Sequence, residues 1–291
     1  MASEGKSYGD VLAAAQAAGF AEADPTADVE GLDARNKLVL LTQLAFGTWV
    51  PPARVRTTGI TGVTAFDMAA AAAGGFTIKL LGVSELFDES SADGGAAAPM
   101  SDLSGDAPPL LRKRFLDIFV SPALVPINSP LGRTGGALNL VQVDSTALGR
   151  TTFSGAGAGR FPTANSIVAD LLAIAKGTNA KRPFPRAPPS KVGLAIKPSD
   201  AREHTFFVRG PAPLANLLSV ALWRQGRSVS PCGVPDENPD KYKAFLVDAS
   251  ARELTSLIRR AARKVAGADA SEAGSVEDDL VAQVATYQVV K

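Results

Sequence analysis

The chain has 291 residues, of which 46% are hydrophobic and 20% are charged. This is the composition of an ordinary globular protein, and the length suffices for one large domain or two of usual size. Thirty Lys and Arg residues against 29 Asp and Glu leave a formal net charge of +1. Such a balance excludes no fold, but it argues against nucleic acid or an anionic membrane as the partner and favours a small, soluble substrate.

Cysteine and histidine usage limits the chemistry further. Cys232 is the only cysteine and the sequence holds one histidine, so we expect no intramolecular disulfide and no metal site. Neither a signal-peptide pattern nor a run of about 18 apolar residues occurs. We therefore expect a cytoplasmic protein, or a plastid one if the source is a plant or an alga.

Residues 1–180 are expected to form a mixed α+β domain. Apolar residues at helical spacing, each time followed by a glycine, predict helices at Tyr8–Ala18, Leu32–Phe46 and Pro162–Lys176. Apolar segments predict strands at Phe76–Val83, Leu116–Val120, Ala137–Val143 and Arg150–Phe153. The acidic residues 21–33 are predicted to be a loop, and residues 84–109, which have little to bury, a surface insertion.

A proline-rich segment divides the chain. Residues 181–199 contain five prolines and are predicted to be a stiff, extended linker. Beyond it, strands and helices are predicted in the order βαββαβ, at His204–Arg209, Leu214–Gly226, Arg227–Cys232, Tyr242–Asp248, Ala251–Val265 and Tyr287–Val290. This order resembles the ACT family of small-molecule regulatory domains, so we expect residues 200–291 to form an ACT-like domain. Where ACT domains often carry an acidic residue before Pro-Gly, this chain has Arg209-Gly-Pro-Ala-Pro213.

The acidic segment offers a candidate catalytic pair. Asp33 and Lys37 are four residues apart in a predicted helix, so they share one face and can hold a lysine ammonium beside a carboxylate. A solvated surface ion pair explains the same spacing. Asp24-Pro25 is typical of a turn, and Asp28 can equally cap the following helix.

Three further features each allow two interpretations. The loop Gly155–Gly159 (GAGAG) lies between a predicted strand and helix, where small residues let a ligand approach backbone N–H groups. Its spacing is not G-x-G-x-x-G, and a packing-driven glycine turn explains it too. Lys79 either reaches a pocket from its strand or lies at an edge or surface. His204 is expected to be structural or at the surface.

One longer pattern connects these residues. The stretch Gly19–Leu38, GFAEADPTADVEGLDARNKL, resembles the signature of homoserine dehydrogenases. Further matches follow in that family's order: LAFG at 44–47, IKLL at 78–81, LVP at 124–126, GAGAGRFPTANSIVADLL at 155–172 and IAKG at 174–177. The resemblance covers about residues 8–177.

The resemblance implies an oxidoreductase that interconverts L-homoserine and L-aspartate 4-semialdehyde with NAD(P), a step in threonine, methionine and isoleucine biosynthesis. It makes Lys37 and Asp33 the catalytic pair. Lys37 would deliver a proton to the carbonyl oxygen as hydride reaches the carbon, while Asp33 holds the lysine and the substrate hydroxyl. Glu22 would bind the substrate's α-ammonium group, and Asp28 would line the same pocket.

The resemblance also places Gly157 and Gly159 against the nicotinamide end of the cofactor. Members of the family begin with a Rossmann domain that binds NAD(P), whereas no strand, glycine loop and helix of that kind precede Ser7. We therefore expect a truncated or fragmentary enzyme, a homodimer, that needs a nucleotide-binding domain in cis or in trans. The alternative is a non-catalytic, dimeric regulatory or amino-acid-binding module derived from that enzyme.

Overall fold

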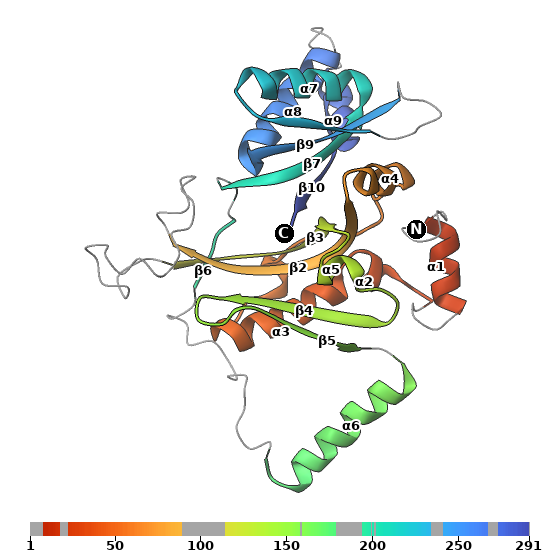
Figure 1. Cartoon of the computed structure of the whole chain (residues 1–291), viewed down its shortest axis with the longest axis vertical. Helices are drawn as coiled ribbons and strands as arrows, with labels where there is room; N and C mark the ends of the chain where they lie inside the picture. Colours follow the sequence, from red (N-terminus) through yellow and green to blue (C-terminus); the bar gives the residue numbers. More distant parts are fainter. Residues whose placement is uncertain are drawn as a thin grey trace, which may run out of the picture.

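The computed structural model describes residues 8–17, 23–88, 114–157, 159–178, 194–198, 200, 202–233, 241–266 and 273–290. These residues form the predicted mixture of helices and strands, with one large sheet and one separate hairpin (Figure 1). The strands are β1 Arg56–Thr57, β2 Phe76–Asp88, β3 Arg114–Pro126, β4 Leu138–Ser145, β5 Gly149–Ala156, β6 Ala195–Ile196, β7 Glu203–Pro211, β8 Val229–Cys232, β9 Tyr242–Ser250 and β10 Ala285–Val289. The helices are α1 Tyr8–Ala17, α2 Thr26–Val29, α3 Leu32–Phe46, the 3₁₀ turn η1 Pro52–Arg54, α4 Ala65–Ala73, α5 Pro130–Arg133, α6 Arg160–Ala175, α7 Ala212–Arg224, α8 Ala251–Ala266 and α9 Ala273–Ala282.

Strand β3 is the centre of the large sheet. Strand β2 pairs antiparallel along its whole length. On its opposite edge, β3 pairs in parallel with three short strands, one after another: β6 at Phe115–Leu116, β1 at Phe119–Val120 and β10 at Ala123–Leu124. Pro122 falls between the residues that pair with β1 and β10, where its missing N–H removes no ladder bond on that edge. One strand thus joins segments from both ends of the chain.

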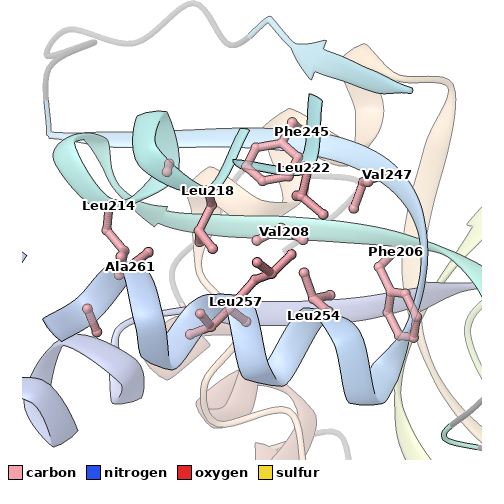
Figure 2. Packing of buried hydrophobic residues seen from close by; sticks show 13 residues of the cluster. Phe206, Val208, Leu214, Leu218, Leu222, Phe245, Val247, Leu254, Leu257 and Ala261 are labelled. Carbon is pink, nitrogen blue, oxygen red and sulfur yellow. The ribbon is translucent and has the colours of Figure 1, made fainter. Parts of the chain in front are cut away.

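The C-terminal half has the predicted element order, with α9 as an additional helix before the last strand. Its strands lie in the order β10-β7-β9-β8 with antiparallel neighbours, as in a ferredoxin-like split βαβ unit. Buried side chains from α7 and α8 pack against those of β7 and β9 (Figure 2). This confirms the βαββαβ order, whereas the ACT assignment stays a prediction.

The two halves of the chain meet along β10. Because β10 pairs with both β3 and β7, the halves share one continuous sheet. An apolar cluster crosses the same seam and includes Ile78, Leu124, Phe207 and Tyr287. The division at 181–199 stays a prediction: most of that segment lies outside the described residues, and its described part contributes β6, which pairs with β3.

A buried ion pair also crosses the seam. Asp67, on α4, is fully buried. Its carboxylate accepts hydrogen bonds from Arg209 Nε at 2.9 Å and Nη2 at 3.2 Å, and from the hydroxyl of Tyr287 at 3.3 Å. Arg209 donates as well to the carbonyl of Gln283 at 3.1 Å. Burial and the nearby Asp67 charge raise the pKa of Tyr287 above its usual value.

Several element boundaries predicted from the sequence were wrong. The surface insertion was expected to begin at residue 84, yet β2 continues to Asp88, because residues 84–88 pair with Arg114–Ile118 of β3 and Phe87 packs on Phe115. Residues 89–113 of the expected insertion lie outside the described residues. The acidic loop contains a one-turn helix, α2. At the end of β2, tertiary contacts decide the local structure.

The hairpin of β4 and β5 and helix α6 lie outside the large sheet, and each exposes apolar side chains. No described residue of these three elements is buried. Large apolar side chains are nevertheless numerous among them: Leu138, Val143, Phe153, Phe161, Ile167, Val168, Leu171, Leu172 and Ile174 are all exposed. A lone two-stranded hairpin is only marginally stable, so these exposed side chains indicate association with another domain or chain.

Candidate active site

Helix α3 carries the predicted catalytic pair close to its start. Lys37 Nζ lies 2.5 Å from Asp33 Oδ2, and the two side chains are 68% and 46% exposed. Leu38 and Val39, on the other side of the helix, are buried in a cluster with β2 and β3. An ion pair this exposed contributes little to folding stability. Both charged groups are exposed and therefore accessible to a ligand.

The start of α3 depends on a glycine. Gly31 precedes the helix with φ at +76°, in the left-handed region that favours glycine. A Cβ at Gly31 would lie 3.1 Å from Val120 Cγ1 and 3.4 Å from Thr57 Cγ2. The glycine thus lets the start of α3, and Asp33 with it, lie directly on β1 and β3.

The acidic segment before α3 is ordered by its own turn. Asp24 accepts hydrogen bonds from the Thr26 hydroxyl at 2.6 Å and the Thr26 N–H at 3.1 Å, which lower the pKa of the Asp24 carboxyl. Asp28 is exposed on α2 and does not cap α3, whose N-cap is Gly31. The capping interpretation of Asp28 therefore fails, which leaves its carboxylate available to a ligand. Glu22 lies outside the described residues.

A loop that the sequence analysis overlooked fixes this segment from the other side. Residues 58–61 follow β1; Ile60 donates its N–H to the carbonyl of Val29 at 2.8 Å, and the Thr61 hydroxyl donates to Glu30 Oε1 at 3.1 Å. A Cβ at Gly59 would lie 2.2 Å from the Val29 carbonyl oxygen. The closely spaced glycines of Gly59-Ile-Thr-Gly62 were the only sequence signal for this contact.

The glycine loop before α6 has three differently constrained glycines. A Cβ at Gly157 would lie 1.5 Å from Asn139 Nδ2, so packing explains this residue. Gly159 has φ at +109° and is the N-cap of α6. A Cβ at Gly155 would meet nothing within 4 Å, so neither packing nor backbone strain requires that glycine. Small residues beside an exposed helix N-terminus fit the close approach of a cofactor to backbone N–H groups.

Lys79, His204 and Cys232 have structural surroundings. The Lys79 ammonium donates to the Thr134 carbonyl at 2.6 Å, and burial lowers its pKa. His204 Nδ1 lies 3.0 Å from Gln288 Nε2. The pKa of His204 is lowered, first by burial and second by the positive charge of Arg202. Burial raises the pKa of the Cys232 thiol. Lys79 therefore ties β2, which among the described strands pairs with β3 alone, to the loop that leads into the hairpin.

Metal and membrane features are absent from the part of the chain that the structure describes. Within that part, no three His, Cys, Asp or Glu side chains are grouped so that they could hold a metal ion. Nor does any helix there have the length and apolar character needed to span a bilayer.

Comparison with known proteins identifies one family. The model of the homoserine dehydrogenase family matches residues 1–172, more than half of the chain. The chain belongs to the homoserine dehydrogenase family. The homoserine dehydrogenase of Mycobacterium tuberculosis is 36% identical over 283 residues, which cover 96% of this chain and 58% of that protein. The homoserine dehydrogenase of Pseudomonas aeruginosa is 36% identical over 207 residues, or 71% of this chain and 41% of that protein.

Solved homoserine dehydrogenases share the fold. The enzyme of Thiobacillus denitrificans matches all of this chain and 60% of its own length, with a TM-score of 0.68 and 28% identity. A homoserine dehydrogenase of Staphylococcus aureus matches all of this chain with a TM-score of 0.62 and 22% identity. The chain spans roughly two fifths to three fifths of the length of these relatives.

Proposed function

We propose that this chain supplies the substrate-binding and proton-transfer part of an NAD(P)-dependent homoserine dehydrogenase. The reaction is the interconversion of L-homoserine and L-aspartate 4-semialdehyde, in the biosynthesis of threonine, methionine and isoleucine. The observation that carries the proposal is the exposed pair of Lys37 and Asp33, 2.5 Å apart at the start of α3, within a segment that follows the family signature. A cytoplasmic location belongs to the same proposal, or a plastid one for a plant or algal source.

Each charged group has a definite task in this reaction. The Lys37 ammonium donates a proton to the carbonyl oxygen of the semialdehyde during reduction and accepts one from the homoserine hydroxyl during oxidation. Asp33 keeps the ammonium in place through the short ion pair and orients the hydroxyl. Asp28, together with Glu22, attracts the α-ammonium group of either substrate.

The glycine loop is the proposed cofactor contact. Gly157 and Gly159 would lie against the nicotinamide end, which donates or accepts the hydride when the cofactor is bound. Gly159 and the α6 N-terminus offer N–H groups at this place, whereas the Gly157 N–H donates to the Ala137 carbonyl at 3.4 Å. The nucleotide-binding domain, in cis or in trans, must then reach this end of α6, so we assign it to the exposed apolar side of that helix.

The hairpin supports the proposed homodimer. Among the strands that the structure describes, β4 and β5 pair only with each other, and Phe153 on β5 is 61% exposed. Two such hairpins from two copies would bury one another's apolar side chains in a self-complementary interface.

The decisive experiment supplies the nucleotide-binding domain of a related enzyme, fused to this chain or mixed with it, and measures homoserine-dependent reduction of NAD(P). We expect activity that Lys37→Ala lowers about 10²- to 10⁴-fold in kcat, the usual contribution of a positioned acid–base group. Lys264→Ala, an exposed lysine in the last turn of α8, is the matched control and is expected to retain activity.

Two results would contradict the proposal. One is equal activity of the Lys37→Ala protein and the unchanged protein. The other is no activity in a folded complex that binds the cofactor, which would favour the alternative, a dimeric regulatory or amino-acid-binding module. The ACT-like order of the C-terminal half supports that alternative.

A further inference from the structure

The loop of residues 58–61 is held at both of its ends. At its start, Thr58 donates its N–H to the carbonyl of Val120 on β3 at 2.8 Å. Beyond its end, Val63 is buried in the apolar cluster that crosses the seam between the two halves. The next residue, Thr64, caps α4 through a reciprocal pair of hydrogen bonds. The loop is therefore a fixed part of the structure.

Helix α2, in contrast, depends on its neighbours for its place. All four of its residues are described, and none of their side chains is buried. The loop 58–61 contacts the end of this helix. Ile60 donates its N–H to the carbonyl of Val29 at 2.8 Å, and Thr61 donates its hydroxyl to Glu30 Oε1 at 3.1 Å. Because the loop is fixed and burial does not anchor α2, the loop determines where α2 lies.

The loop acts on only one part of the proposed active site. Asp28, which is proposed to bind the α-ammonium group of the substrate, lies on α2, next to Val29. The proposed catalytic pair lies on α3, which has its own anchor, since Leu38 and Val39 are buried against β2 and β3. Loss of a contact between the loop and α2 therefore displaces Asp28 and leaves the catalytic pair in place.

A single hydroxyl makes the side-chain part of this contact. A threonine hydroxyl has one hydrogen to donate, and Thr61 donates it to the carboxylate of Glu30. We propose that Thr61 is a positioning residue, which acts through Glu30 to hold Asp28 where it binds the α-ammonium group. This inference rests on the proposed function, because the dehydrogenase reaction is what gives Asp28 that ligand.

The expected signature is a higher KM with an unchanged kcat. The α-ammonium group takes no part in proton or hydride transfer, so Asp28 binds it equally well in the ground state and in the transition state. Removal of such uniform binding raises KM and leaves kcat as it was. In the fusion with a nucleotide-binding domain, we expect Thr61→Val to raise the KM for homoserine about tenfold, the lower end for a hydrogen bond to a charged group.

Matched variants separate the contact from other effects. Thr61→Ser restores the hydroxyl and should restore the KM. Glu30→Gln removes the charge but keeps an oxygen that accepts the hydrogen bond, so it should raise the KM much less than Thr61→Val. Thr255→Val removes an exposed hydroxyl that donates to the Ala251 carbonyl at 2.8 Å in α8 and should behave like the unchanged protein. In an Asp28→Asn protein, Thr61→Val should raise the KM no further, because the carboxylate that it positions is gone.

The placement of α2 is also measured without any reaction. The amides of residues 28–31 donate to carbonyls of α2 and of Pro25. Their hydrogen–deuterium exchange should be faster in Thr61→Val than in the unchanged protein, because a looser turn opens more often, and Thr61→Ser should restore the slower exchange. This measurement uses the full chain alone and does not depend on a nucleotide-binding domain.

Four results would overturn the proposal. They are unchanged exchange in Thr61→Val, a kcat that falls as much as the KM rises, fully additive effects of Thr61→Val and Asp28→Asn, and a KM in Glu30→Gln as high as in Thr61→Val. An inactive fusion would contradict the proposed function instead. Faster exchange in Thr61→Val would then still support the placement of α2 by Thr61.

Discussion

Among single residues, Gly59 lies so close to the acidic segment that any side chain at this position should displace that segment. A Cβ there would lie 2.2 Å from the Val29 carbonyl oxygen and 2.5 Å from Glu30 Cα, so the acidic segment has to move away. We expect Gly59→Ala to lower kcat/KM for homoserine at least tenfold in the fusion with a nucleotide-binding domain. Gly62→Ala, in the same loop but with nothing within 4 Å of the added Cβ, should behave like the unchanged protein.

A second prediction at single residues concerns the contribution of the buried Asp67–Arg209 pair to the stability of the fold. Removal of one partner leaves a buried charge uncompensated, which typically costs about 3–5 kcal/mol. We expect Asp67→Asn to lose that much in the free energy of unfolding, measured with urea. Asp144→Asn breaks the exposed Arg150 pair and should cost about 1 kcal/mol or less. Similar losses from both changes would show that the seam pair is not structurally important.

At the scale of elements, helix α6 has an apolar side that nothing in the described chain covers. Leu171 is 60% exposed, so Leu171→Asp should leave the stability of the chain nearly unchanged. We expect the same change to abolish association with a separately supplied nucleotide-binding domain, measured by analytical ultracentrifugation. Asn165→Asp adds an equal charge to the same helix without removing an apolar group and should associate normally.

The elements also show what the sequence could predict. Apolar residues at helical spacing, followed by a glycine, predicted helices α1, α3 and α6. The contact between Lys37 and Asp33 followed from helical spacing alone. The two-residue strands β1 and β6 have no local signal, since only their pairing with β3 defines them. The tie between the loop 58–61 and Val29 joins segments about 30 residues apart, and no periodicity encodes such a contact.

At the scale of the whole molecule, β10 unites the two halves in one sheet. We expect the chain to unfold in one cooperative transition by calorimetry, because the sheet and the cluster with Tyr287 both cross the seam. A chain shortened to residue 284 loses β10 and should show two transitions. Loss of Lys291 alone should leave one. A single transition after removal of β10 would mean that the halves are coupled by other contacts.

The pairing of β3 with β10 has a consequence during synthesis. The end of β3 around Ala123 and Leu124 stays open on one edge until β10 leaves the ribosome, because these two residues pair with Gln288 and Val289. At about 5–20 residues per second the delay is roughly 10 to 30 s. During that time the open edge can pair with any other nascent strand. Expression should therefore benefit from slow synthesis at low temperature or from chaperones that shield nascent chains.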